Sequence, residues 1–309
     1  MYNHLLRMSD LTQSDIINIL ELADKLKYEN KNNIAHTILK GKTLGMIFKK
    51  SSTRTRVSFE VGMYQLGGHA LCLNVNDLQI GRGEPIEDTA RVLSRYVNGI
   101  MIRTFAHKEA EDLAYFGSIP VINGLTDDEH PCQVLADLMT IREKKGRLEG
   151  IKLCYIGDGN NMANSLIVGG LTVGMSVSAA CPKGYSPQEK ALEFAKTYGD
   201  KFILTDDIFE AACGADVIYT DVWASMGMES EKDIRKKDFK GYCVDNKLLN
   251  IAKDDVMIQH CLPAHRGEEI TTEVFEAHAD EIFDEAENRL HAQKAVLVKL
   301  LGGNKKNKR

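Results

Sequence analysis

Short apolar runs alternate with longer segments of helical pattern along most of the chain. In the first half, four apolar runs predict strands, at residues 42–48, 70–75, 99–103 and 120–122. Helical patterns lie between them at residues 53–66 and at residues 85–97, the latter with Pro85 at its first position. A further helix is predicted to begin at His130-Pro131 and to end near Gly146.

The second half repeats this alternation with new elements. Five apolar runs predict strands, at residues 152–156, 176–180, 201–204, 216–220 and 256–259. Helices are predicted to begin at Ser186-Pro187 and at Thr272, and an amphipathic helix over residues 285–301 closes the chain. The polar segment 142–150, which ends in glycine, is the predicted domain boundary.

Strands that alternate with helices are typical of parallel sheets covered by helices. We therefore predict an α/β protein of two doubly wound parallel-sheet domains, with the active site in the cleft between them. The first domain is expected to span residues 1–140, with residues 285–309 packing back on it, and the second to span residues 150–284. Such sheets bind ligands beyond the carboxyl ends of their strands, so residues that directly follow a strand are the informative ones.

Length and charge narrow the class of protein. The 309 residues suit two domains of about 150 residues each. A net charge of −5 argues against nucleic-acid binding, which depends on a basic surface. The seven cysteines are widely spaced without a C-x-x-C pair, so a reducing, cytoplasmic environment is expected rather than a disulfide framework or a zinc site.

Two segments bear on a membrane role, and neither is expected to have one. The N-terminal residues carry charge and lack an apolar core, so no signal peptide is expected. Residues 160–182 hold no charged side chain and are long enough to cross a bilayer. Their asparagines, glycines and serines favour a buried helix followed by a buried strand instead.

The segment after the first predicted strand offers an anion site. Ser52, Thr53, Arg54 and Thr55 open a helix there, where unsatisfied backbone N–H groups, hydroxyls and a guanidinium can bind phosphate. The Walker pattern is absent. A Ser/Thr-capped helix with solvated arginines is the alternative interpretation.

Two further clusters begin helices. His130, in His130-Pro131-Cys132-Gln133, is expected to be neutral beside a helix N-terminus and to donate a hydrogen bond to a carbonyl oxygen, or else merely to cap the helix. The loop 157–161 follows a strand and ends in Asn161. It resembles a dinucleotide loop superficially but lacks the G-x-G-x-x-G spacing.

Two clusters lie at strand ends in the second half. Asp221, in the run 221–227, can pair with an ammonium group, although an ordinary turn explains the same residues. His260-Cys261-Leu262-Pro263 follows the last strand. Its spacing is poor for zinc, and Cys261 beside two histidines could be a thiol of lowered pKa.

Taken together and in order, these motifs resemble those of the aspartate/ornithine carbamoyltransferase family. The marks are S-T-R-T-R at 52–56, H-P-x-Q at 130–133, D-x-x-x-S-M-G at 221–227 and H-C-L-P at 260–263. The resemblance covers almost the whole chain, and the S-M-G and H-C-L-P runs point to ornithine as the acceptor. It implies transfer of the carbamoyl group from carbamoyl phosphate to the δ-amine of L-ornithine, giving L-citrulline and phosphate.

The resemblance also implies roles for individual residues. The residues expected to bind carbamoyl phosphate are Ser52, Thr53, Arg54, Thr55, Gln79, Arg103, His130, Gln133, Cys261, Leu262 and Arg289. Those expected to bind ornithine are Asn161, Asp221, Ser225 and Met226. Arg103, His130, Asp221 and Cys261 are the candidate catalytic residues, and either Asp221 or Cys261 could remove the amine proton. Gln79 is expected to reach the site of a neighbouring subunit in a homotrimer or an assembly of trimers.

No nucleotide, metal or organic cofactor is expected, because carbamoyl phosphate is itself the activated reagent. Three alternatives stay open at this point. The acceptor could be aspartate, putrescine or an acylated ornithine. The loop 157–161 could serve a nucleotide-dependent oxidoreductase. The chain could also be a catalytically inactive regulatory subunit.

Overall fold

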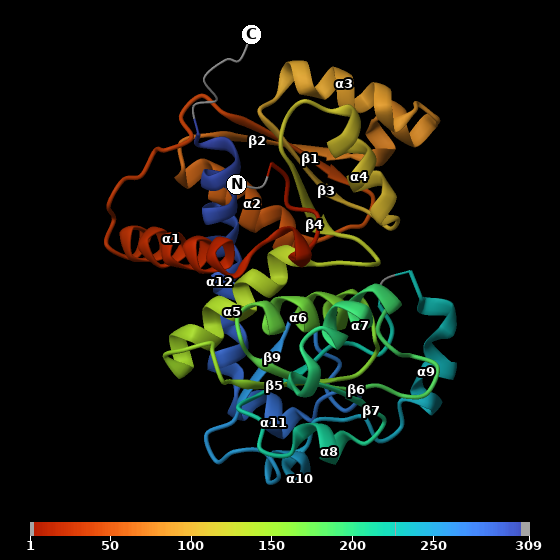
Figure 1. Ribbon diagram of the computed structural model, residues 1–309. Helices are drawn as coiled ribbons and strands as arrows, with labels where there is room; N and C mark the ends of the chain where they lie inside the picture. The colour runs from red at the N-terminus through yellow and green to blue at the C-terminus, as the bar shows by residue number, and fades with distance from the viewer. Residues whose placement is uncertain (1–2, 226, 304–309) are drawn as a thin grey trace. The chain divides into compact units, whose positions relative to one another are not determined.

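The computed structural model describes residues 3–225 and 227–303 and divides into two compact units (Figure 1). The first unit contains the described residues up to Leu135 and those from Arg289 onward, and the second runs from Ala136 to Asn288. The division between the units falls inside helix α5 (Pro131–Lys145) and again inside helix α12 (Ala279–Leu301). Among the described residues, no helix is both long and apolar enough to cross a membrane.

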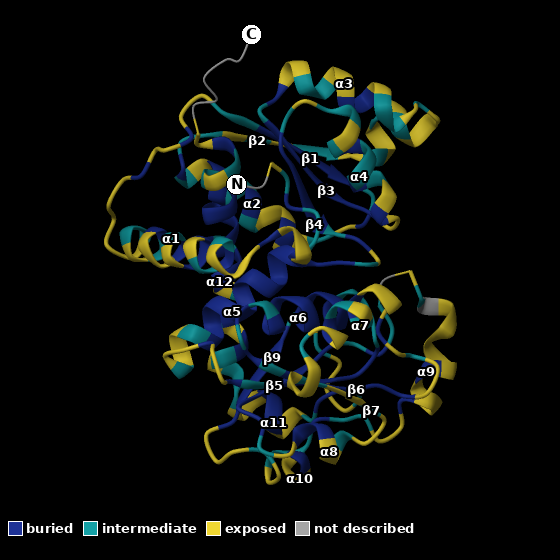
Figure 2. Ribbon diagram, viewed as in Figure 1, coloured by how far each residue is buried: buried dark blue, intermediate teal, exposed yellow. Residues whose placement is uncertain are grey.

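The first unit is built on a four-stranded parallel sheet in the order β2-β1-β3-β4. Its strands are β1 (Thr43–Phe48), β2 (His69–Asn74), β3 (Gly99–Arg103) and β4 (Val121–Leu125). Its other helices are α1 (Gln13–Lys31), α2 (Thr53–Gln65), α3 (Ile86–Tyr96) and α4 (His107–Phe116). The central strands β1 and β3 are buried almost throughout, whereas β2 at the edge is partly exposed (Figure 2). Central strands of a parallel sheet are covered on both faces, which explains their continuous apolar sequence.

Helices cover both faces of this first sheet. Helices α3 and α4 pack together over one face, where Ala90, Ala110 and Leu113 join the apolar side chains of the strands. On helix α2, a Cβ atom added at Gly62 would meet side-chain atoms of Leu290, Lys294 and Leu297 of α12. Helix α2 therefore packs closely against α12.

The second unit is built on a five-stranded parallel sheet in the order β7-β6-β5-β8-β9. Its strands are β5 (Lys152–Ile156), β6 (Ser176–Ala180), β7 (Phe202–Thr205), β8 (Val217–Thr220) and β9 (Met257–His260). Its other helices are α6 (Asn161–Thr172), α7 (Glu189–Lys196), α8 (Ile208–Ala212), α9 (Lys232–Asp238), α10 (Asn246–Leu249) and α11 (Thr272–Ala277). Figure 1 shows α6 and α7 on one side of this sheet and α8, α10 and α11 on the other. Side chains of α8, α10 and α11 pack with those of β5, β8 and β9 into one apolar core.

The two parallel sheets with helices on both faces confirm the predicted α/β class. The uncharged segment after Asn160 forms the buried helix α6 and the strand β6, as expected. Three helix starts differ from prediction. Pro85 has an extended ψ of 140° and is therefore the N-cap of α3 rather than its first helical residue. Helix α7 begins at Glu189 rather than near Ser186, and α12 begins at Ala279, six residues before the predicted position.

Helices α1 and α4 are additions to the predicted elements. Helix α1 begins with a capping box, in which the hydroxyl of Thr12 accepts from the backbone N–H of Asp15 at 3.1 Å. Its apolar side chains Ile16, Ile19, Ala23 and Leu26 repeat at helical spacing and are buried.

Candidate active site

Several candidate residues lie where the strand order of each sheet reverses direction. In the first unit this position falls between β1 and β3. The segment 52–55 follows β1, and Arg103 is the last residue of β3. In the second unit it falls between β5 and β8, which are followed by the loop 157–161 and by Asp221. Doubly wound sheets bind their ligands at such reversal points. The topology therefore gives each unit one expected ligand-binding edge.

The segment after β1 forms a capped helix N-terminus. The hydroxyl of Ser52 accepts a hydrogen bond from the backbone N–H of Thr55 at 3.1 Å. Thr53 and Arg54 are exposed in the first turn of α2, whereas Thr55 is buried. A capped turn holds the remaining backbone N–H groups in fixed directions, as an anion site requires.

Arg103 and Arg289 converge on Thr55 from distant parts of the chain. The guanidinium of Arg103 donates to the hydroxyl of Thr55 at 3.3 Å, and that of Arg289 donates to the same hydroxyl at 3.5 Å. Arg289 also donates to Oε1 of Gln133 at 2.5 Å. The structure thus brings Thr55, Arg103, Gln133 and Arg289 into one buried group.

Gln293 is a member of this group that the sequence did not reveal. With its amide oriented to satisfy both neighbours, its oxygen accepts from Arg289 at 2.7 Å and its nitrogen donates to Ser58 Oγ at 2.5 Å. Gln293 lies four residues after Arg289 on α12, so both side chains are on the same face of the helix. That spacing is the sequence signal by which it could have been found.

His130 is neutral in this surrounding. Burial is the main cause that holds the pKa of its imidazole well below the usual value, and the charges of Arg289, Arg103 and Arg54 lower it further. The expected neutral state is therefore confirmed. The cause of the neutral state, however, is burial and the charge of the arginines rather than the helix N-terminus. Three guanidinium groups near a neutral imidazole suit a phosphate dianion with a carbonyl oxygen beside it.

Gln79 lies apart from this group. It is exposed at the start of the 3-10 helix η3 (Gln79–Arg82). Among the described residues, its side chain makes no hydrogen bond to the residues at the N-terminus of α2 or to Arg103. Its expected role at a neighbouring subunit's site stays a prediction.

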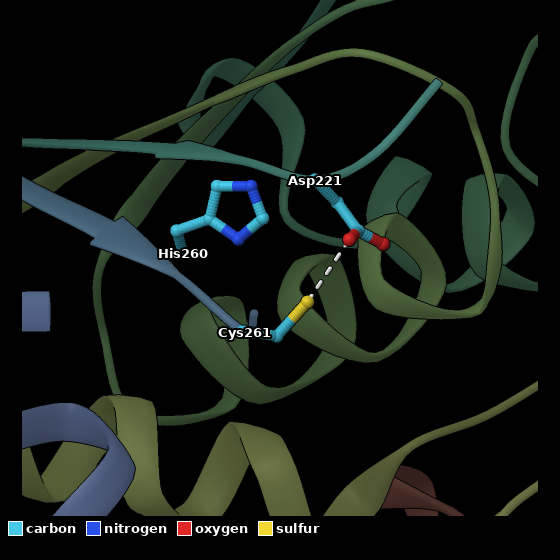
Figure 3. A group of neighbouring side chains, drawn as sticks. All are labelled: Asp221, His260 and Cys261. Atoms are coloured by element: carbon cyan, nitrogen blue, oxygen red, sulfur yellow. Dashed lines mark hydrogen bonds between the residues drawn. The ribbon is translucent and has the colours of Figure 1, made fainter. Parts of the chain in front are cut away.

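In the second unit, the carboxylate of Asp221 is held by three hydrogen-bond donors. Its Oδ1 accepts from the backbone N–H of Val222 at 2.8 Å and from the thiol of Cys261 at 3.0 Å, the contact drawn in Figure 3. Its Oδ2 accepts from Nδ2 of Asn160 at 2.8 Å. None of these donors carries a charge, so the carboxylate is oriented while its negative charge is left uncompensated by them.

The hypothesis of a lowered thiol pKa at Cys261 is wrong. Burial and the adjacent carboxylate of Asp221 raise the pKa of this thiol well above its usual value. A neighbouring negative charge disfavours a thiolate, and the sulfur instead donates to Asp221. Leu262, which follows, has a φ of 60°, so the chain turns sharply after Cys261.

His260 lies close to Asp221 and Cys261 (Figure 3), but both of its ring nitrogens make other contacts. Its Nδ1 accepts from the backbone N–H of Leu262 at 2.9 Å, and its Nε2 faces Glu269 at 3.0 Å. Because Nδ1 accepts, the ring proton is on Nε2 and is donated to Glu269. Both ring nitrogens are therefore engaged in positioning the loop.

Asn161 is the first residue of α6, and Asn160 before it is the N-cap. Ser225 is half-buried, and Met226 lies outside the described residues. The loop 157–161, which leads into α6, packs against a neighbouring stretch of the chain. A Cβ atom at Gly159 would lie 2.2 Å from the backbone of Ser186 and Pro187, so glycine is required there by the neighbouring chain.

Comparison with known proteins assigns both units to domains of one family. Residues 3–143 match the carbamoyl-phosphate-binding domain of the aspartate/ornithine carbamoyltransferases, and residues 149–300 match their aspartate/ornithine-binding domain. The chain belongs to the aspartate/ornithine carbamoyltransferase family. Within this family, the chain is 57% identical over 301 residues to the ornithine carbamoyltransferase of Carboxydothermus hydrogenoformans, with 96% of this chain and 97% of that protein covered.

The chain is also 54% identical to the ornithine carbamoyltransferase of Thermococcus kodakarensis, and the match covers 96% of this chain and 95% of that protein. Among solved structures, the ornithine carbamoyltransferase of Pyrococcus furiosus matches with a TM-score of 0.93 and 54% identity. That match covers 98% of each chain. Both domains of the family are thus present at nearly full length.

Proposed function

We propose that this chain transfers the carbamoyl group from carbamoyl phosphate to the δ-amine of L-ornithine, giving L-citrulline and phosphate. The observation that carries this function is the pairing of two matched family domains with an oriented carboxylate in the second one. Relatives that are 54–57% identical over nearly the full length carry the name ornithine carbamoyltransferase. The geometry of each unit supplies what the reaction needs.

The first domain would bind carbamoyl phosphate. The N-terminus of α2 with Ser52, Thr53 and Arg54 offers backbone and side-chain donors to the phosphate. Arg103, Thr55 and the neutral His130 would surround the carbamoyl oxygen, where negative charge develops in the transition state. Stabilisation of the departing phosphate by arginines and positioning of the reactants would supply most of the rate.

The second domain would bind ornithine. We propose that Asp221 pairs with the cationic amino acid, that Asn161 and Ser225 contact its α-carboxylate and α-ammonium, and that Met226 adds a backbone donor. The δ-amine resembles a lysine amine, with a pKa of about 10.4, and must lose a proton before it attacks. Cys261 is a poor base because its thiol already holds a proton, which leaves Asp221 as the candidate for that step.

Acceptor choice follows from the uncompensated charge of Asp221. Aspartate would bring a second carboxylate toward an acid, and N-acetylation would remove the ammonium that Asp221 pairs with. Putrescine lacks the α-carboxylate, so the protein groups that donate to this carboxylate would stay unpaired. Unpaired buried groups can reject an analogue by about 10⁴ or more. We therefore expect L-ornithine to exceed all three by at least about a thousandfold in kcat/KM.

The test is to measure the ureido product that the purified protein forms from carbamoyl phosphate and each of the four amines, which is citrulline for L-ornithine and the corresponding carbamoylated amine for the others. Production of citrulline from L-ornithine, with the other amines at least about a thousandfold poorer, would support the proposed function. Equal use of putrescine would contradict it. A fluorescence titration with NADH would separately test the oxidoreductase alternative, and absence of binding is the expected result.

We further propose that the protein is a homotrimer or an assembly of trimers acting in cytoplasmic arginine metabolism. The exposed position of Gln79 on η3 is compatible with a contact across subunits. Mixed assemblies of Gln79→Ala and Arg103→Ala chains would test this sharing. Sites formed by Gln79 of one chain and Arg103 of another should restore activity that neither pure variant has.

A further inference from the structure

We propose that Asn160 is a positioning residue for the acceptor amine, because one side-chain amide both caps α6 and orients the carboxylate of Asp221. Asn160 has no assigned part in the carbamoyl transfer described above. Its role rests on the proposed function only in the identity of the amine that Asp221 meets.

The amide of Asn160 is fixed in one orientation by its neighbours. Its Oδ1 accepts from the backbone N–H of Met162 at 2.9 Å and of Ala163 at 3.3 Å, which makes Asn160 the N-cap of α6. The hydroxyl of the buried Tyr155 also lies 3.3 Å from Oδ1. Since Oδ1 is surrounded by donors, Nδ2 must face the carboxylate of Asp221, 2.8 Å away.

This arrangement connects two strand ends at the reversal point of the second sheet. Asn160 follows β5 and Asp221 follows β8, and these two strands are neighbours. With Nδ2 of Asn160 on Oδ2, and Val222 and Cys261 on Oδ1, rotation of the carboxylate is blocked at both oxygens. The lone pair that remains, on Oδ2, is held in a fixed direction before any amine arrives.

The chemical nature of the donor is part of the role. A lysine or arginine at this position would also hold Asp221, but it would neutralise the charge that a cationic amine needs. An amide holds the carboxylate without adding charge. Asn160 therefore contributes to the preference for a cationic acceptor as well as to geometry.

Two substitutions separate capping from positioning. Serine is as good an N-cap as asparagine but cannot reach Asp221, so Asn160→Ser keeps the cap and loses the donor. We expect the Tm to change by no more than about 2 °C. We expect kcat/KM for ornithine to fall about 10- to 100-fold, the loss typical of one hydrogen bond to a charged group. Competitive inhibition by inorganic phosphate, which reports on the first unit, should not change.

Asn160→Asp adds a pH signature that a purely structural role would not produce. An aspartate still caps α6, but it places a second carboxyl group against Asp221. At low pH the two carboxyls share a proton, and the protonated one replaces the amide donor. Above the raised pKa of the pair both ionise and repel each other. The ratio of variant to wild-type kcat/KM for ornithine should therefore fall as the pH rises.

Asp207→Ser is the matched control in the same unit. Asp207 caps α8 by accepting from Phe209 at 2.8 Å and Glu210 at 3.3 Å. Its replacement by serine should reproduce any effect of changing a cap while leaving kcat/KM for ornithine unchanged. If Asn160→Ser behaves like Asp207→Ser, or keeps kcat/KM for ornithine within about twofold of wild type, Asn160 has no positioning role.

The wild-type protein is the arm that tests the proposed function itself. Failure of the wild type to carbamoylate ornithine would refute that function. The positioning role of Asn160 would then be tested by a crystal structure of Asn160→Ser. In that structure, a rotated carboxylate at Asp221 would support the positioning role. An unmoved carboxylate would overturn it.

Discussion

Arg289 donates a hydrogen bond to Gln133 at 2.5 Å, although 156 residues separate the two in sequence. Gln133 lies in the first turn of α5, and Arg289 lies near the middle of α12. The bond places a guanidinium beside His130 and Thr55, where it lowers the pKa of the imidazole. The charge of the proposed phosphate site is thus assembled from three distant segments of the chain.

Arg54→Ala and Arg103→Ala should each abolish useful activity without unfolding the protein. Each guanidinium offers charge-assisted hydrogen bonds to phosphate, and loss of one should cost about 2–4 kcal/mol of transition-state stabilisation. Steady-state kinetics together with thermal unfolding would measure both effects. Arg56→Ala is the control, since Arg56 lies on the same helix and is exposed like Arg54, but is paired with Glu60 at 3.0 Å. Near-normal turnover in either variant at the wild-type KM would refute the phosphate-site assignment.

The logarithm of kcat/KM for ornithine should rise with pH through the neutral range, because the nucleophile is a neutral amine. His130 should add no inflection there, since its pKa is already held well below the usual value. Initial rates between pH 6 and 9 at saturating carbamoyl phosphate would give the profile. A flat profile would be incompatible with an amine whose deprotonation limits the reaction.

Glu285 should make the protein less stable as the pH rises. Burial, the charge of Asp137 and a hydrogen bond with that carboxyl raise the pKa of Glu285 well above its usual value. The stabilisation is therefore complete below the unfolded pKa of about 4.3 and is lost as the pH rises through the folded pKa. Each unit of the shift corresponds to about 1.4 kcal/mol.

The variant that tests this is Glu285→Gln. In the wild type the backbone N–H of His260 donates to Glu285 at 3.0 Å, and the amide oxygen of glutamine can accept the same hydrogen bond. Urea unfolding of both proteins from pH 4 to 8 would show the wild type losing stability relative to the variant. Parallel curves across this range would show that Glu285 is not protonated in the folded state.

Lys294 should produce the opposite slope at alkaline pH. Burial lowers the pKa of its ammonium to about 8, although it donates to Gln65 at 2.8 Å and lies 2.7 Å from His36 Nε2. Between pH 8 and about 10.4 the unfolded chain binds more protons, so stability should rise by up to about 3 kcal/mol. The free energy of unfolding of Lys294→Met, subtracted from that of the wild type, isolates this rise. A difference that stays constant from pH 7 to 10 would contradict the lowered pKa.

The strands could be predicted because most of them are buried on both faces. Apolar runs such as 99–103 and 152–156 coincide with β3 and β5 because the middle of a central parallel strand is covered on both faces, which leaves charged residues only at the strand ends, as at Arg103 and Lys152. Helix starts were less predictable, since a cap depends on local dihedral angles. Pro85 shows this, because its fixed φ suits both the N-cap and the first helical position.

The sequence predicts where several candidate residues lie better than it predicts which side chains they contact. Residues after strands did gather at the reversal points, but the partners of each side chain come from remote segments. Cys261 illustrates the difference. In sequence its neighbour is His260, which suggested a reactive thiol, whereas in the fold His260 turns to Glu269 and the thiol meets Asp221. The sequence also contains two adjacent asparagines without indicating that Asn160 is the one on Asp221.

The raised pKa of Cys261 should make its thiol resistant to oxidants. Peroxides and alkylating agents react with thiolates, and a thiol that keeps its proton beside a carboxylate reacts slowly. Burial likewise raises the pKa of Cys132, Cys154 and Cys181, each to about 12. A cysteine can therefore lie in contact with the carboxylate of Asp221 without making the protein a target for redox inactivation.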